Sequence, residues 1–328
     1  MSLYIYKMEA ITEAIKKSRN LKESSVKAYV FNLQKLHDKM FNHKNIQDLD
    51  FLKDTTEVIE TLNDLKLSSR KTYLAAIVVA LATQEEKYEK PLKEYRELMM
   101  DHIQEYKGIQ EEQSKSDSQK ENWTSMASIK KVPRRYKKEL VDRKIFDKDP
   151  KDVNKKEMDL IQKWLVSSLY VLDDANPPPR NDFTPMKVIS FKQFTDIPDG
   201  EKEKNNYLVI QSRNKKFFSL GEYKTDKTYG LKRIDLGSKL NSVINIYQKF
   251  NPGEYLIYNS RGGPMTPNGL TKYLNKTFEP TGKKNISSTM LRHIYITEKL
   301  GGPTLKEKKA LAEKMGHSVA TQEIYKKN

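Results

Sequence analysis

The chain of 328 residues is long for one domain and comfortable for two, because single domains usually hold on the order of 100 to 200 residues. Its 60 Lys and Arg residues against 44 Asp and Glu residues give a formal charge of +16, which attracts polyanions: nucleic acid first, with a membrane surface or an acidic protein as alternatives. The absence of cysteine excludes disulfides, thiolate metal sites and a cysteine nucleophile, and it fits an intracellular protein.

Helices are predicted through the first third of the chain. Residues 1–11 lack the basic-then-apolar pattern of a secretion signal, and the longest apolar run, residues 73–82, is about half of a membrane span, so no membrane partner is expected. A helix is expected after a serine cap at residues 24–25, a shorter one within residues 51–65, and the most apolar helix from residue 67, again with a serine cap.

Arg70 and Lys71 lie in the first turn of the helix that opens at residue 67. Cations oppose the helix dipole there, because the dipole favours acidic residues at a helix start. Backbone N–H groups at a helix start bind phosphate well, so the two cations are interpreted either as a contact to the DNA backbone or as two solvated surface charges.

A polar, serine-rich segment without apolar periodicity follows a helical pattern of mixed charge over residues 87–107. We place the domain linker in this segment, at residues 111–122. The linker would join a helical domain of residues 1–110 to a second domain of residues 123–328.

A strongly basic stretch, residues 123–151, opens the second domain, and its densest part contains Arg134 and Arg135. Clustered positive charge is typical both of solvated surface and of nucleic-acid contacts. The stretch is therefore interpreted either as an exposed loop or as a DNA-facing segment in which these two arginines bind DNA.

The second domain is predicted to be mostly helical. An apolar pattern at helical spacing begins at residue 154 and stops at three prolines, directly before Arg180. Strands are expected at residues 207–210, 216–223 and 231–236, and helices at residues 238–250, 266–274, 288–300, 304–315 and around Tyr325. The predicted fold class is mainly α with a small antiparallel β-sheet.

Several common catalytic motifs are missing. The chain has no Gly-rich phosphate loop, no HExxH, no paired Cys ligands and no Gly-x-Ser-x-Gly elbow, and its carboxylates form no pattern that would support a two-metal nuclease. We therefore expect no metal and no other cofactor.

The C-terminal half carries an ordered set of polar residues: Arg180, Lys224, Thr289-Met290-Leu291-Arg292-His293, Met315-Gly316-His317-Ser318 and Tyr325. This order resembles the catalytic domain of the tyrosine recombinases, or phage-type integrases, from about residue 154 to the end. The first domain is similar to the core-binding domain of that family. The strings PPPRNDF at residues 177–183 and YKTDKTYG at residues 223–230 resemble integrases of virophages, giant viruses and related mobile elements.

The resemblance implies that the protein breaks and rejoins DNA. Tyr325 would be the nucleophile and would form a 3′-phosphotyrosine, which a 5′ hydroxyl of another strand then resolves. Arg180 and Arg292 match the two arginines of the family. Two guanidiniums are suited to this reaction because their N–H groups can fork onto the nonbridging phosphate oxygens, where charge accumulates in the transition state.

By the same resemblance, Lys224 would protonate the departing 5′ oxygen as the general acid. Lys227 is the alternative for this role and otherwise a DNA contact. His317 occupies the position of a family histidine or tryptophan and would hydrogen-bond the phosphate or brace the tyrosine.

Two positions depart from the family pattern. Thr289 stands where the family often has histidine, and a threonine hydroxyl can donate to phosphate but is no comparable base, so either His293 or no residue supplies that function. The acidic residue often found three positions after the first arginine is Phe183 here, while Asp182 lies one position earlier.

The expected partners are double-stranded DNA attachment sites, bound by a homotetramer. The expected location is inside the cell with DNA, in a host nucleus or a cytoplasmic viral factory if the protein is viral, where it would serve viral genome integration. A type IB topoisomerase shares the chemistry and is the nearest alternative. A noncatalytic DNA-binding relic of the same fold is the alternative from another class, which Thr289 makes conceivable.

Overall fold

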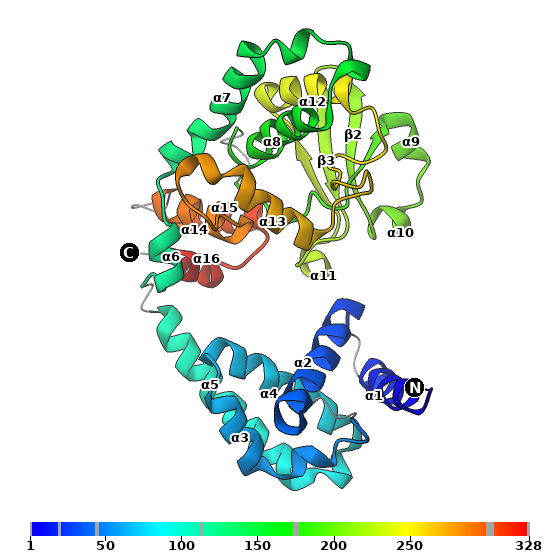
Figure 1. Ribbon diagram of the computed structural model, residues 1–328, viewed down its shortest axis with the longest axis vertical. Helices are drawn as coiled ribbons and strands as arrows, with labels where there is room; N and C mark the ends of the chain where they lie inside the picture. Colours follow the sequence, from blue (N-terminus) through cyan, green and yellow to red (C-terminus); the bar gives the residue numbers. More distant parts are fainter. Residues whose placement is uncertain are drawn as a thin grey trace. The chain divides into compact units, whose positions relative to one another are not determined.

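The computed structural model describes residues 2–18, 21–42, 46–111, 114–172, 177–299 and 305–326. Helices dominate the described residues, with a four-stranded sheet among them (Figure 1). The chain divides into two compact units, Met1–Glu112 and Gln113–Asn328. None of the helices in the described ranges is long and apolar enough to cross a membrane.

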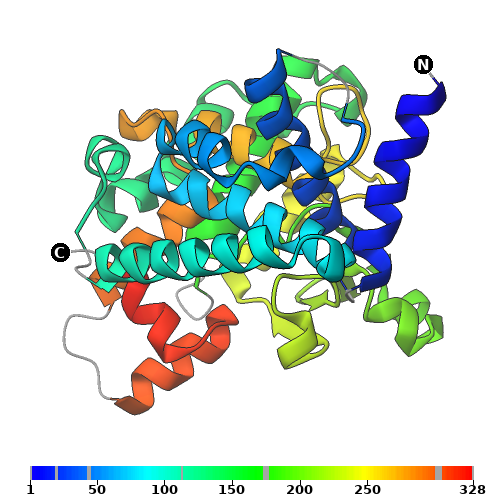
Figure 2. The same ribbon diagram turned by 90° about the horizontal axis from the view of Figure 1, so that it is seen from below.

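The first unit is a group of helices around α4, Leu67–Leu81, whose residues 76–81 are all buried. Helix α4 contacts α2, Glu23–Phe41, and α5, Glu89–Glu111, the long cyan helix of Figure 2. A helix that is apolar all round needs neighbours all round, and α2 and α5 supply two of them. The other elements of this unit are α1 (Ser2–Ser18), η1 (Asp50–Lys53), α3 (Thr55–Asn63) and η2 (Ala82–Lys87).

The serine caps predicted for α2 and α4 are wrong. The N-cap residues are Lys22 and Lys66, both in extended conformation, and neither caps its helix with its side chain. Each helix begins one or two residues earlier than its serines, so the hydroxyls lie within the first turn. Helix α1 was not predicted, although its Ile15 is fully buried in the core of this unit.

The second unit contains eighteen elements among its described residues, in the order α6 (Asp117–Asn122), α7 (Met126–Asp142), η3 (Ile145–Asp147), η4 (Pro150–Asp152), α8 (Lys155–Val171), β1 (Lys187–Ser190), α9 (Phe191–Asp196), α10 (Asp199–Lys202), β2 (Asn206–Ser212), β3 (Lys215–Leu220), α11 (Asp226–Tyr229), β4 (Lys232–Asp235), α12 (Ser238–Phe250), α13 (Pro267–Thr277), η5 (Glu279–Thr281), α14 (Ser288–Lys299), α15 (Leu305–Met315) and α16 (Val319–Tyr325).

The predicted linker of residues 111–122 is too long, because half of it forms a helix of the second unit. Residues 117–122 form α6, which opens with a capping box between Ser116 and Gln119. Asn122 is 1% exposed, and its side-chain oxygen accepts a hydrogen bond from the backbone of Asn285 at 2.9 Å. The polar side chains of this segment cap a helix and make a buried hydrogen bond, although polar composition alone indicates a linker.

The basic stretch after α6 is a helix rather than the exposed loop that the sequence left open. Ile129, Val132, Tyr136 and Leu140 follow one another at spacings of three and four and are buried along one face of α7. Arg134 and Arg135 are exposed on the same helix.

The sheet has the order β1-β2-β3-β4 and is mixed, not purely antiparallel as predicted. The pairs β2–β3 and β3–β4 are antiparallel, while β1 runs parallel to β2. Strand β1 was not predicted, because its four residues are too few to show an alternating pattern. The chain crosses from β1 to β2 through α9 and α10, which is why the pair is parallel.

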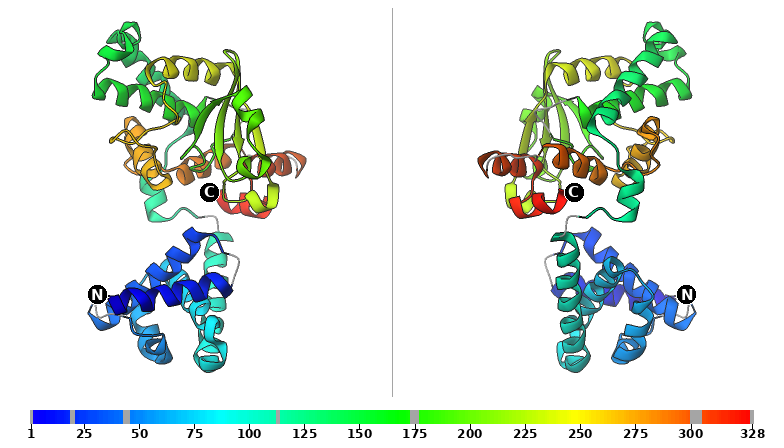
Figure 3. Two further views of the ribbon diagram at one scale, coloured as in Figure 1. Left: turned by 90° about the vertical axis from the view of Figure 1, so that its right-hand side faces the viewer. Right: turned by 90° about the vertical axis from the view of Figure 1, so that its left-hand side faces the viewer.

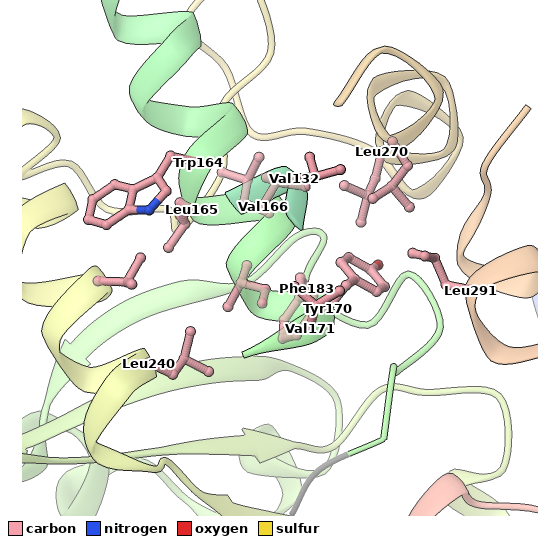
Figure 4. Close-up of a cluster of buried hydrophobic side chains, with 14 of the residues drawn as sticks. Val132, Trp164, Leu165, Val166, Tyr170, Val171, Phe183, Leu240, Leu270 and Leu291 are labelled. Atoms are coloured by element: carbon pink, nitrogen blue, oxygen red, sulfur yellow. The ribbon is translucent and has the colours of Figure 1, made fainter. Parts of the chain in front are cut away.

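Both faces of the sheet are covered. Leu208 and Phe218 point into the main core with α8 and α12, whereas Tyr207 and Phe217 point to the other face, where Phe194 of α9 packs. Figure 1 shows α8 and α12 on one side of the sheet and α9 on the other. Helix α8 is buried on nearly all sides, and Figure 4 shows its apolar residues among side chains from α7, α12, α13 and α14.

Candidate active site

Arg180 lies in the segment that follows α8. The three prolines before it prevent helix continuation, and Pro177 and Pro178 are buried. Its backbone is held at both ends: the N–H donates to Asp182 Oδ2 at 3.2 Å, and the carbonyl accepts from the hydroxyl of Tyr170 of α8 at 2.9 Å. The core helix therefore fixes the position of Arg180.

Arg292 is the largest of the fully buried side chains described and is 1% exposed. Its Nη1 donates to the carbonyl of Pro178 at 2.9 Å and its Nη2 to the carbonyl of Met315 at 3.2 Å, while Nε finds no hydrogen-bond partner among the described residues. Burial, with the like charge of Arg180, lowers the pKa of Arg292 to about 10, so the guanidinium remains charged at neutral pH.

The two arginines share a cavity of about 30 Å³, which has room for one or two water molecules. Asp182 and Lys232 also line this cavity. Burial raises the pKa of Asp182, and Arg180 opposes that rise. Lys314 lines it as well, so four cationic residues and one carboxylate surround one small cavity and leave a net positive charge, which suits an anion.

Tyr325 is the last residue of α16, and its ring packs against two histidine rings. The centroid of the His293 ring is 4.8 Å away and that of the His317 ring 5.4 Å away, the latter stacked at 7°. The guanidinium carbon of Arg292 lies 5.4 Å from the centroid of the Tyr325 ring. These contacts hold the ring of Tyr325 over an arginine of the cavity.

The two histidines hold this arrangement through their Nδ1 atoms. His293 Nδ1 donates to the carbonyl of Tyr325 at 2.9 Å, and His317 Nδ1 donates to the carbonyl of Ser318 at 3.0 Å, since a carbonyl can only accept. In His317 this leaves Nε2 as an acceptor, and Nε2 is buried without a partner among the described residues. Burial lowers the pKa of His317 to about 4, and Arg292 and Arg180 add to the effect while the bond to Ser318 opposes it.

The end of α15 brings the site residues together. Gly316 has φ +66° and closes a Schellman motif, in which the N–H groups of Gly316 and His317 bond to the carbonyls of Glu313 and Ala312. The next three carbonyls receive side-chain donors from three other segments: Lys314 O from Lys232 Nζ, Met315 O from Arg292 Nη2, and Gly316 O from Thr225 Oγ1.

Lys224 and Lys227 lie in the segment between β3 and β4, next to Thr225, and both are exposed. The bond from Thr225 to Gly316 measures 2.9 Å and holds this segment against the turn that carries His317. Figure 3 shows the yellow-green segment beside the red C-terminal helices in both views. Neither Lys224 nor Lys227 lines the cavity, whereas Lys232 does.

Lys232 was not among the predicted site residues. A signal was present, because Lys232 and Ile234 alternate on one face of the predicted strand at residues 231–236, and both line the cavity. Thr289 lies one turn before Arg292 on α14 but is exposed and does not line the cavity.

Arg70 and Lys71 have partners within the first unit. The Arg70 guanidinium donates to the carbonyls of Leu65 at 2.7 Å and Asn63 at 2.6 Å, across the turn between α3 and α4. Lys71 Nζ lies 4.5 Å from the centroid of the Tyr106 ring of α5. These contacts explain both cations at the start of α4 structurally, and a contact to the DNA backbone stays a prediction.

On α7, Arg135 lines a second cavity of about 250 Å³ together with Lys131 and residues of η5. Arg134 is exposed beside it, so DNA binding by either arginine also stays a prediction. Among the described residues, no group of three or more His, Cys, Asp or Glu side chains is placed to hold a metal ion.

No protein-family model and no curated protein matches the chain. Among solved structures, the XerH site-specific recombinase bound to difH substrate in a pre-cleavage complex aligns with a TM-score of 0.51 at 14% identity, over 98% of this chain and 81% of that chain. The post-cleavage complex of XerH with palindromic difH substrate aligns with a TM-score of 0.50 at 13% identity, over the same shares of both chains. XerA recombinase covers 97% of this chain and 93% of its own at 12% identity, with a TM-score of 0.38. The chain therefore has the fold of the XerH site-specific recombinase.

Proposed function

We propose that the protein is a site-specific tyrosine recombinase, which cleaves and rejoins DNA through a covalent bond between Tyr325 and a DNA phosphate. One observation carries the proposal: the ring of Tyr325 lies over the buried guanidinium of Arg292, and Arg292 shares a small positive cavity with Arg180. The recombinase fold supports it.

Two bonds change in the proposed first step. The Tyr325 hydroxyl gives up its proton to water and its oxygen forms a bond to phosphorus, while the bond from phosphorus to the 5′ oxygen breaks. The 5′ oxygen takes up a proton, which leaves a 3′-phosphotyrosine and a free 5′ hydroxyl. A 5′ hydroxyl of another strand reverses the step. The phosphoester bond energy is retained in the intermediate, so no nucleotide is consumed.

Arg180 and Arg292 supply the positive charge in this step. Attack on a phosphodiester adds negative charge to its nonbridging oxygens, and guanidinium N–H groups already in position stabilise that charge without reorganisation. The Nε of Arg292, which has no partner among the described residues, is one such N–H group. With two fixed cations the reaction proceeds without a metal ion.

The histidines and lysines have separate roles. His293 is a positioning residue, because its Nδ1 holds the backbone of Tyr325. His317 braces the tyrosine ring by stacking, and in the neutral tautomer that the bond from Nδ1 to the Ser318 carbonyl requires, Nε2 accepts rather than donates. Thr289, which is exposed, can donate at most a hydrogen bond to DNA. The motif assigns the general acid to Lys224, with Lys227 as the alternative, whereas the lysines that line the cavity are Lys232 and Lys314.

Double-stranded DNA is the proposed partner. The charge of +16 provides a salt-sensitive attraction to phosphates, and the XerH structures contain that enzyme with its difH substrate. We propose that Arg70, Lys71, Lys227, Arg134 and Arg135 contact the backbone of an attachment site. A homotetramer would join two such sites. The strings at residues 177–183 and 223–230 resemble integrases of virophages and related elements, and they favour integration of a viral genome or mobile element inside the cell.

The test is covalent capture. The full chain is incubated with a pool of nicked suicide duplexes of randomised sequence, in EDTA, and adducts that survive denaturant are recovered and sequenced. Tyr325→Phe keeps the ring that packs against the histidines but lacks the attacking oxygen. Tyr229→Phe removes the hydroxyl of an exposed tyrosine in α11 and is the matched control.

We expect adducts with the wild type and with Tyr229→Phe, none with Tyr325→Phe, and the adducted peptide to contain Tyr325. Tight DNA binding without any adduct would favour the noncatalytic DNA-binding alternative. Relaxation of supercoiled plasmid by the monomer, without strand exchange between two sites, would favour a topoisomerase.

A further inference from the structure

Lys232 is the first residue of β4, and it pairs with Leu220 of β3. Its side chain is partly buried and lines the cavity together with Arg180, Asp182 and Arg292. The ladder fixes the backbone at this position, so the direction of the side chain toward the cavity follows from the register of the sheet.

The ammonium of Lys232 shares an anchor with the guanidinium of Arg292. Lys232 Nζ donates to the carbonyl of Lys314, and Arg292 Nη2 donates to the next carbonyl, that of Met315. These carbonyls end α15, where the helix dipole is negative and favours cations. The two cations are therefore held side by side by consecutive residues of one helix end.

The surroundings of Lys232 suit the release of a proton. Burial lowers its pKa, Arg292 and Arg180 lower it further, and Asp182 and Glu313 oppose the effect. A lysine with a lowered pKa gives up its proton more readily than an ordinary surface lysine. Lys224 and Lys227 are exposed instead.

We propose that Lys232 is the general acid that protonates the 5′ oxygen as it leaves phosphorus. The proposal rests on the proposed function and names a residue that the family motif does not select. One N–H proton passes from Nζ to the 5′ oxygen while the bond from phosphorus to that oxygen breaks, which leaves a neutral amine. In the rejoining step the attacking 5′ hydroxyl returns this proton to the amine.

The experiment replaces the departing oxygen with sulfur. A thiolate leaves without protonation, because a thiol has a pKa of about 8.5 against about 15.7 for water. The duplex recovered by covalent capture is synthesised with either oxygen or sulfur at the 5′ bridging position. Rates of adduct formation are measured for the wild type and for Lys232→Ala, Lys232→Arg, Lys224→Ala and Lys227→Ala.

We expect Lys232→Ala to slow cleavage of the oxygen duplex by roughly 10²- to 10⁴-fold and to cleave the sulfur duplex at nearly the wild-type rate. Lys232→Arg should behave in the same way, because a guanidinium keeps the charge but does not release a proton. For Lys224→Ala and Lys227→Ala, the ratio of the cleavage rates of the sulfur and oxygen duplexes should equal that of the wild type. Cleavage of the sulfur duplex also demonstrates that a variant is folded.

Two outcomes would overturn the assignment. If Lys232→Ala is equally slow on both duplexes, Lys232 acts in binding or folding and not as an acid. If Lys224→Ala or Lys227→Ala shows the rescue by sulfur and Lys232→Ala does not, the motif lysine is the acid. A wild type without adduct on any duplex would instead count against the proposed function itself.

Discussion

Two large effects on stability oppose each other at Arg292. Burial lowers its pKa from 12.5 to about 10, which corresponds to a destabilisation of the charged form by roughly 3 kcal/mol at any pH below both values. The carbonyls of Pro178 and Met315, which Arg292 saturates, would each cost about 1–3 kcal/mol if left buried without a donor.

Replacement by methionine removes the charge and both hydrogen bonds. The lost bonds cost about 2–6 kcal/mol and the relieved charge returns roughly 3 kcal/mol, so Arg292→Met should destabilise the protein by at most roughly 3 kcal/mol. Arg292→Lys keeps the buried charge, but an ammonium cannot reproduce the planar fork to both carbonyls. We therefore expect the lysine variant to be less stable than the methionine variant, although lysine is the more conservative change.

The assay uses the fact that both tryptophans of the chain, Trp123 and Trp164, lie in the second unit. Their fluorescence in a urea titration of the full chain reports the unfolding of that unit. Both variants should lose adduct formation by roughly 10²- to 10³-fold or more, as expected for a lost donor to a developing oxyanion. A lysine variant more stable than the methionine variant would refute the reasoning that a buried ammonium, which keeps the cost of the charge but cannot satisfy both carbonyls, is worse than no charge at this position.

Three further predictions concern Gly316 and His317 of the same site and the two exposed arginines of α7. Gly316→Ala should destabilise the second unit by about 1–2 kcal/mol, because φ at this position is +66°. The new Cβ would also lie 3.0 Å from Thr225 Oγ1, which adds a steric cost. In the urea titration, adding Thr225→Ala to the same chain should remove only this steric cost. The pKa of His317 is about 4 in the folded chain against 6.5 in the unfolded chain, so between these pH values only the unfolded chain takes up a proton at this residue. The free energy of unfolding should therefore fall as the pH falls from 6.5 to about 4. His317→Gln should reduce that fall when the unfolding of both proteins is measured over the same pH range. Removing Arg134 and Arg135 together should lower the slope of log affinity against log salt by about 0.9 for each phosphate they neutralise, and an unchanged slope in a DNA-binding titration would exclude α7 from the interface.

Local signals in the sequence were sufficient for most helices of the second unit. The predicted helix at residues 238–250 has the bounds of α12, and Thr266 caps α13. The helix that carries Tyr325 is present as α16. In each case, neighbouring residues of the chain contain both an apolar face of period 3.6 and a boundary residue such as Gly, Thr or Pro. The helix can therefore be recognised without knowledge of distant contacts.

Features that depend on distant contacts were not predicted. The parallel pairing of β1 with β2 requires residues 187–190 to meet residues 207–210 across α9 and α10. The same holds for Lys232, whose direction depends on the register of β4 against β3. The motif selects Lys224 by its position in the chain, but which lysine lines the cavity is decided by tertiary structure.

The end of α15 explains how residues far apart in sequence form one site. A helix leaves its last four carbonyls without partners within the helix. In α15, the Schellman turn at Gly316 satisfies the first two of these carbonyls, and the last two accept hydrogen bonds from the side chains of Lys232 and Arg292. The carbonyl of Gly316 itself accepts from Thr225, the neighbour of Lys224.

The same turn then delivers His317 to its stacking position on Tyr325. A change in this helix end would therefore shift a lysine, an arginine and a histidine together. We expect substitutions at Gly316 to impair cleavage by more than their cost in stability explains. Comparison with a core substitution of similar cost, such as Ile244→Val at about 0.5–1.5 kcal/mol, would separate the two effects. Equal activity of the two variants at equal stability would show that the helix end contributes to folding alone.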